Sequence, residues 1–223
     1  MSRNERYRTI ADLPRKLPVF PLPGALVLPR ADLPLNIFEP RYLAMVDDAL
    51  SGDRLIGMIQ PADEDADLAG TPELRRIGCV GRITAYAEMP DDRMLITLTG
   101  VCRFAIKREL DSVKPYRQVA PDFSDFADDL DPGHGQGLVD RDNLLKVFRE
   151  YLTANDLSAD WDQVAAASNE SLVNTLSLLA PYPPRDKQAL LEAFDLQTRA
   201  EVLIALTEIA LAKSDSSALS RLQ

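Results

Sequence analysis

Seven prolines fall between positions 14 and 40, and they divide this part of the chain into short apolar runs. Proline fixes φ and lacks a backbone N–H, so a continuous helix cannot pass through the segment. Short strands can form here, with the prolines at turns, edge positions or strand ends. Strands are therefore predicted in three runs, LPVFPL, ALVLP and LPLNIF.

One helix is expected directly after these runs, over residues 40–51. Pro40 suits the first turn of a helix, and apolar side chains recur after it at helical spacing until Gly52. Glu39 stands just before this helix, where its carboxylate can accept bonds from free amides.

Short β-type runs return at 55–60, 77–88 and 94–106. The last two are joined by the turn-forming residues 90–93, which predicts a hairpin. Symmetry about Asp91 and Asp92 would place Cys79 opposite Phe104, and Cys102 opposite Gly81. Diagonal thiols disfavour a disulfide, so each cysteine is interpreted as a small buried hydrophobe. A bulge at Gly100 would shift this register by one or two residues.

An acidic, glycine-containing stretch then predicts a boundary between two domains. Residues 121–137 contain five aspartates, three glycines and no Lys or Arg. We therefore predict a β domain over 14–120, a linker over 121–138 and an α-helical bundle over 139–213, where apolar residues recur at helical spacing. The polar residues 214–223 are predicted to form a flexible tail.

Composition limits the class of partner. Apolar residues make up 46% and charged residues 27%, which is ordinary for a globular protein. The formal net charge is −10 and the pI about 4.7, so nucleic acid is a disfavoured partner. Apolar runs are too short to span a membrane, and the charged N-terminus lacks the apolar core of a secretory signal. These features predict a cytoplasmic protein.

Several motifs resemble one family. They are LPVFPLPGALVLPRADLPLNIFEPRYLAMVDDAL at 17–50, GDRLIGMI at 52–59, IGCVGRI at 77–83 and ITLTGVCRFAI at 96–106. Their order and spacing resemble the N-terminal, substrate-binding domain of Lon, the ATP-dependent protease La. The C-terminal helices match only in character. The resemblance implies an α+β fold: a PUA-like six-stranded β-barrel with one helix, followed by a C-terminal α-helical bundle.

The resemblance also implies a function without catalysis. No G-x-x-x-x-G-K-[ST] motif occurs, so the phosphate-binding loop of the Lon ATPase is missing, and the chain ends at Gln223. We therefore expect a free-standing module that is not an enzyme, takes no cofactor and binds exposed or unfolded polypeptide. An ATP-dependent protease or a chaperone is the expected further partner. Peptides would pair with an edge strand or lie in an apolar groove, with the proline-rich edge near 18–29 as one candidate surface.

Two alternatives stay open. PUA-like barrels often bind RNA or nucleotides, and small basic-aromatic clusters occur at 104–108 and at Tyr116-Arg117, although the net charge of −10 disfavours this interpretation. The chain would otherwise be a structural subunit that binds one fixed protein through the helical bundle.

The candidate peptide-binding residues are Arg41, Tyr42 and Arg103, which would border a peptide-contact groove. The alternative is that they fix the helix to the barrel, with the Arg103 guanidinium paired with a buried carboxylate. The residues interpreted as a structural motif are Phe38, Glu39, Pro40, Gly100 and Phe104.

No catalytic or metal site is predicted. His134, the single histidine, stands between two glycines and is interpreted as an exposed linker residue without an oriented nucleophile. The acidic stretches 63–67 and 122–131 do not follow the spacing of a calcium loop, and Asp47 and Asp48 point apart as helix neighbours.

Overall fold

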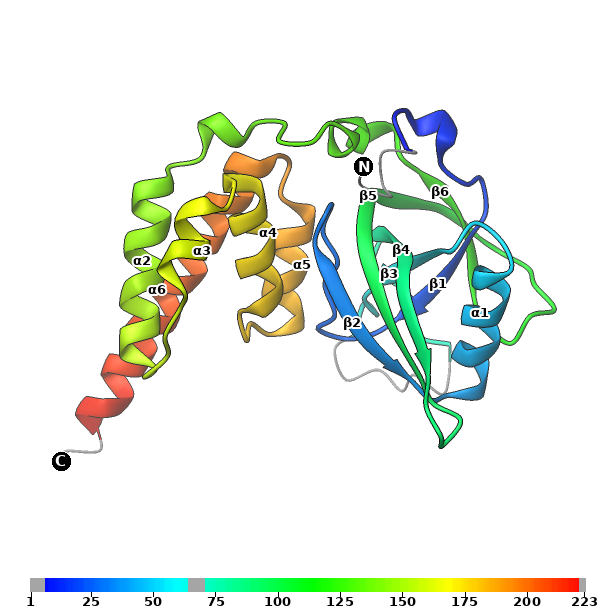
Figure 1. The fold of residues 1–223 in the computed structure, drawn as a ribbon, viewed down its shortest axis with the longest axis horizontal. Coiled ribbons are helices and arrows are strands. Elements are labelled where there is room, and N and C mark those ends of the chain that lie inside the picture. The colour runs from blue at the N-terminus through cyan, green and yellow to red at the C-terminus, as the bar shows by residue number, and fades with distance from the viewer. Residues whose placement is uncertain (1–6, 64–70, 221–223) are drawn as a thin grey trace.

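The protein consists of a β-barrel and a helical bundle that lie side by side (Figure 1). The structure is a computed structural model that describes residues 7–63 and 71–220, with side chains described up to Lys213. Within these residues, no helix is both long enough and apolar enough to cross a membrane.

Six strands build the barrel. They lie in the order β2-β5-β4-β3-β1-β6, and an additional pairing of β5 with β6 closes the sheet. The architecture confirms the predicted α+β fold. The strands are β1 (Leu17–Pro21), β2 (Asp32–Ile37), β3 (Leu55–Ile59), β4 (Ile77–Glu88), β5 (Met94–Leu110) and β6 (Gln118–Asp122).

The long strand β5 closes the barrel because one of its edges changes partner along its length. Residues 94–99 pair with β2, whereas most of residues 105–110 pair with β6. Gly100 lies at the change. Its N–H donates to the Ala31 carbonyl and its own carbonyl accepts from Arg30 N, at 2.9 and 2.8 Å. A Cβ on Gly100 would lie 1.9 Å from the Leu28 carbonyl oxygen, so only glycine allows this approach.

Two predictions in the proline-rich segment are wrong. Residues 25–28 form no strand, because only Pro29 in this run makes a bridge, to Gly100. Their side chains Leu26, Val27 and Leu28 are nevertheless buried. The segment near 18–29 is also not a free edge. Strand β1 pairs with β6 at residues 17–18 and with β3 at residues 19–21. The terminal strand of the sheet order with no second neighbour is β2.

The β4–β5 hairpin differs in register from the prediction by about one residue. Cys79 lies opposite Arg103, not Phe104, and Cys102 lies opposite Val80. The reason is a loop centred on Asp91, together with register shifts between Ile83 and Ala85 and between Val80 and Gly81. Both cysteines are buried and free, as predicted.

Six α-helices occur in the described residues. Helix α1 lies beside the barrel, on the side away from the bundle, and the others form the bundle (Figure 1). Asp140, Asp160 and Ser168 cap three bundle helices by accepting backbone N–H bonds. The helices are α1 (Pro40–Leu50), α2 (Arg141–Ala154), α3 (Trp161–Ala166), α4 (Asn169–Leu179), α5 (Pro184–Glu192) and α6 (Leu196–Ser220).

Helix α6 continues to Ser220, into the segment predicted as a flexible tail. The sequence there is polar but contains neither Gly nor Pro, so nothing in it stops a helix. Residues 221–223 lie outside the described residues.

The segment between barrel and bundle is packed against both. Strand β6 extends to Asp122, two residues into the predicted linker, and is followed by the 3-10 helices η2 (Ser124–Leu130) and η3 (Gln136–Leu138). One hydrophobic core continues from barrel residues such as Leu28 and Ile37 to bundle residues such as Leu190 and Leu203. Domain boundaries at 121 and 138 stay a prediction.

Candidate functional site

An apolar hollow lies within the helical bundle. It is a groove of about 470 Å³ between α2, α4 and α6, and the loops that follow α2 and α4 complete its walls. Its walls are mainly aliphatic and aromatic. They include Leu144, Val147, Phe148, Leu176, Leu179 and Leu203.

Three prolines end helix α4 at the edge of this groove. Pro181, Pro183 and Pro184 follow α4 and prevent it from continuing, so the helix ends at Leu179. Leu179 is 75% exposed although it shares an apolar stripe with the buried Leu172. Leu157, in the loop after α2, is also exposed and lines the groove.

Two polar side chains that line the groove, Tyr182 and Thr207, are paired with each other. The Tyr182 hydroxyl and Thr207 Oγ1 lie 2.7 Å apart, and Thr207 Oγ1 donates to the Leu203 carbonyl. Burial raises the pKa of Tyr182, so this hydroxyl stays neutral. Among the described residues, the groove lining contains no charged side chain and no cysteine, so the arrangement suits the binding of apolar groups.

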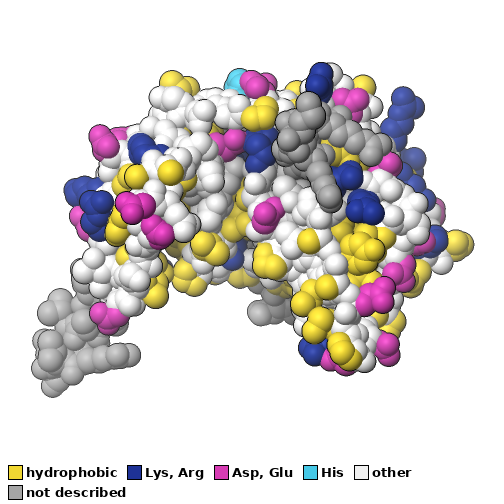
Figure 2. Space-filling view, in the orientation of Figure 1, with side chains coloured by type: hydrophobic (Ala, Val, Ile, Leu, Met, Phe, Trp, Pro, Cys, Tyr) yellow, Lys and Arg dark blue, Asp and Glu magenta, His cyan; other side chains and the backbone are white. Residues whose placement is uncertain are grey.

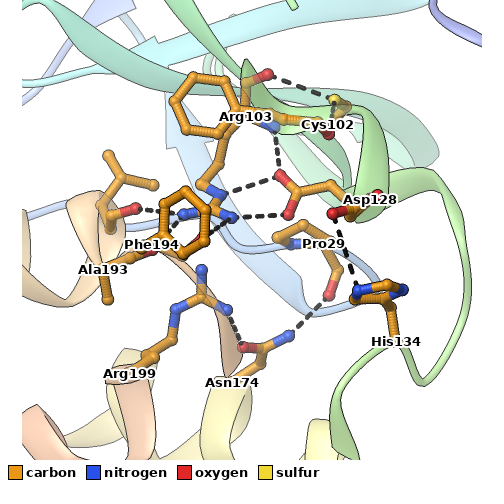
Figure 3. A network of polar contacts seen from close by, with 12 residues as sticks. Pro29, Cys102, Arg103, Asp128, His134, Asn174, Ala193, Phe194 and Arg199 are labelled. Atoms are coloured by element: carbon orange, nitrogen blue, oxygen red, sulfur yellow. Dashed lines mark hydrogen bonds and ion pairs between the residues drawn. The ribbon is translucent and has the colours of Figure 1, made fainter. Parts of the chain in front are cut away.

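The predicted peptide-binding residues lie on two different sides of the barrel. Arg41 is on α1, on the barrel face away from the bundle, whereas Arg103 faces the bundle (Figures 1 and 3). Tyr42 is buried and packs on Phe20 with ring centroids 4.1 Å apart. Arg41 stacks on the outer face of Tyr42 at 4.5 Å and pairs with Glu39. The structure therefore brings Arg41 and Tyr42 together, but not with Arg103.

Arg103 is buried at the junction between barrel and bundle (Figure 3). Its Nε and Nη2 donate to the two carboxylate oxygens of Asp129, both at 2.9 Å. Nη1 donates to the carbonyls of Leu191 and Ala193, and Nη2 also reaches the carbonyl of Phe194. These bonds occupy the guanidinium within the protein, so a peptide role for Arg103 would require them to open.

The residues of the structural motif have separate surroundings. Phe104 is fully buried and meets Phe123 edge-on at 6.3 Å, whereas Phe38 is 63% exposed. Pro40 begins α1 as expected. The Glu39 side chain does not cap this helix, contrary to prediction, because its carboxylate pairs with Arg41 instead.

The remaining candidates for chemistry are His134, the two cysteines and the acidic stretches. His134 is half-exposed, with Asp131 and Asp128 carboxylates 3.5 and 3.7 Å away. Burial raises the pKa of both cysteine thiols and suppresses their nucleophilicity. No group of three described His, Cys, Asp or Glu residues is arranged to hold a metal. The stretch 63–67 lies, except for Asp63, outside the described residues.

The sequence analysis missed the groove. It predicted only a helical bundle over 139–213 from apolar residues at helical spacing, and Leu144, Phe148, Leu176 and Leu179 are among those residues. The available signal was PYPP at 181–184, which is separated from Leu179 by Ala180 alone and prevents α4 from continuing beside the apolar helices α2 and α6.

Comparison with known proteins identifies the class of this fold. Residues 16–208 match the ATP-dependent protease La (LON) substrate-binding domain. The chain belongs to the Lon substrate-binding domain family.

Curated relatives are much longer than this chain. Lon protease 2 of Myxococcus xanthus is 26% identical over 201 residues, which cover 87% of this chain and 24% of that protein. Lon protease of Haemophilus influenzae is 25% identical over 199 residues. The chain therefore spans about a quarter of the length of the curated relatives it matches.

Solved structures agree on the fold. The Lon N-terminal domain protein from Xanthomonas campestris has a TM-score of 0.58 at 23% identity, covering 85% of this chain and 97% of that one. The N-terminal domain of a Mycobacterium avium complex Lon protease gives 0.63 at 18% identity, covering 86% and 98%. At these identities the likeness concerns the fold alone.

Proposed function

We propose that this domain recognises exposed apolar segments of unfolded polypeptide without catalysing a reaction, and that the bundle groove holds them. The observation that carries the proposal is an open, apolar groove with the exposed Leu179 on its rim, inside the region that matches a substrate-binding family.

The groove's size and chemistry favour this class of ligand. A volume of about 470 Å³ lies in the range of ligand pockets and can hold several aliphatic or aromatic side chains. Such side chains are exposed in unfolded chains and buried in folded ones, so an apolar groove discriminates between the two states.

The proposed partner follows from the relatives. They are Lon proteases, and this chain matches about a quarter of their length. We propose that segments bound here are passed to an ATP-dependent protease, so the domain would contribute recognition and another module would contribute hydrolysis.

A charge placed in the groove tests the proposal. We expect Leu179→Glu to weaken binding of a fluorescently labelled, unfolded client at least about tenfold, because the client's apolar side chains would meet a carboxylate. The matched control is Leu138→Glu, because Leu138 is 66% exposed but does not line the groove. Fluorescence anisotropy gives both affinities. Equal binding by both variants and the unmodified protein would place the client elsewhere.

A further inference from the structure

The bundle groove is bounded by three helices and open at its rim. Helices α2 and α4 each pack on α6, and the groove lies between them. Helix α4 stops at Leu179, so its last apolar side chain meets solvent at the rim. A volume of about 470 Å³ accepts several side chains but not a folded domain. The occupant is therefore a single stretch of chain that presents a row of apolar side chains.

The groove residues of α2 form one stripe along two turns of that helix. They are Leu144, Val147, Phe148, Tyr151 and Leu152. The stripe is about 12 Å long at the helical rise, and its spacing of three and four residues is the one with which helices pack on each other. Phe148 and Tyr151 stay partly exposed, so they are available for contact with a further helix.

Most hydrogen-bonding groups of the groove walls are already used. Backbone groups in the middle of α2, α4 and α6 bond within their own helix. The Tyr182 and Thr207 hydroxyls bond with each other, and at the rim the Leu157 N–H donates to the Leu152 carbonyl at 2.9 Å. An extended segment pressed against these walls would lose the hydration of its backbone without regaining bonds. A helix satisfies its own backbone groups and avoids this cost.

The surroundings of the groove are negatively charged. Six charged residues directly adjoin lining residues in the sequence, and four of them are acidic, which gives a local net charge of −2. The acidic ones are Glu150, Asp156, Asp160 and Glu208, and the basic ones are Lys146 and Arg149. The whole chain carries −10. A partner whose polar face is basic therefore complements this rim.

We propose that the groove binds the apolar face of a basic amphipathic helix of about two turns, with apolar anchors at positions i, i+3, i+4 and i+7. This inference rests on the proposed function, because it specifies which segments of an unfolded client the groove selects. Such a segment hides its apolar face in its own folded protein and exposes it on unfolding. On the groove it forms its helix against α2 and α4, with Lys and Arg toward the acidic rim.

Two labelled peptides of identical Leu and Lys composition test the proposal. One places Leu at helical spacing, and the other alternates Leu with Lys as in a strand. We expect the helical pattern to bind at least about tenfold more tightly in fluorescence anisotropy, and to gain helical circular dichroism on binding. Leu179→Asn should remove this binding. Leu138→Asn, at an exposed position outside the groove, should retain it.

The outcomes separate this inference from the proposed function. Equal affinity for both patterns, or tighter binding of the alternating peptide, overturns the helix and leaves the groove as a site for apolar segments. Binding of an unfolded client without binding of the helical peptide has the same meaning. Binding of neither peptide nor client overturns the proposed function itself.

A third peptide, with Glu in place of every Lys of the helical pattern, tests the charge. We expect it to bind about threefold more weakly, because exposed rim charges contribute modestly. Equal or tighter binding of the acidic peptide overturns the assignment of a basic helix.

Discussion

Arg103 on β5 and Asp129 on η2 form a buried pair that joins the barrel to the segment leading into the bundle. Asp129 accepts from the backbone N–H of Arg103 as well as from its guanidinium, with all three bonds at 2.9 Å. The same guanidinium reaches the carbonyls at the end of α5 and beyond it, so one side chain connects three parts of the chain (Figure 3).

We expect Arg103→Met to lower the free energy of unfolding by about 3–5 kcal/mol, because it leaves the Asp129 carboxylate buried without a counter-charge. Urea denaturation followed by circular dichroism measures this change. The matched control is Arg93→Met, because Arg93 pairs with Asp91 on the exposed hairpin loop and should cost less than about 1 kcal/mol. Similar losses in both variants would contradict a structural role for the buried pair.

Gly100→Ala should destabilise the protein by about 1–3 kcal/mol or more, because the new Cβ would meet the Leu28 carbonyl and force two backbone segments apart. Gly137→Ala is the control, since nothing lies within 4 Å of a Cβ there. We expect that variant to stay within about 0.5 kcal/mol of the unmodified protein. Urea denaturation gives the unfolding midpoint of each variant. A Gly100→Ala midpoint equal to that of Gly137→Ala would refute the close approach of Gly100 to Leu28.

The pH dependence of stability should include a contribution from Asp122. Bonds from the Ser124 hydroxyl and N–H, with Lys107 at 3.2 Å, lower the pKa of Asp122 from 3.8 to about 2. The folded state favours the ionised carboxyl. Its stabilising contribution is therefore complete above the unfolded pKa of 3.8 and is lost as pH falls through about 2.

Carboxyl-carbon NMR titration of the native protein should accordingly give a midpoint near 2 for Asp122. Ser124→Ala removes the hydroxyl donor and should raise that midpoint. A titration near 3.8 in the unmodified protein would show that these bonds do not form in solution.

Binding of an unfolded polypeptide should change little between low and moderate salt, because apolar contacts carry it. RNA binding would weaken steeply as counterions are restored. On the face shown in Figure 2, Lys and Arg are interspersed with Asp and Glu and form no continuous basic stripe. Anisotropy of a reduced, unfolded client and of a single-stranded RNA over one salt series measures both. Tight, salt-sensitive RNA binding without client binding would exclude the proposed function.

Local patterns in the sequence determined much of the fold. Helix α1 begins at Pro40 and ends at Leu50, close to the predicted bounds, because proline and apolar spacing act within a few residues. The β4–β5 hairpin was likewise predicted from its turn and its two apolar runs. The Lon-like motifs at 17–106 implied the barrel that the strands form.

Tertiary packing decided the rest. The run at 25–29 has the composition of a strand, but its backbone passes beneath Gly100 without joining a ladder. Sequence analysis expected that Arg103 could meet a buried carboxylate, but only the fold selects Asp129. Leu172 and Leu179 share one helical stripe, yet Leu172 is buried, whereas Leu179 is exposed at the end of α4, where it lines the groove. Periodicity specifies which face of an element is apolar, whereas the three-dimensional arrangement determines what, if anything, covers that face.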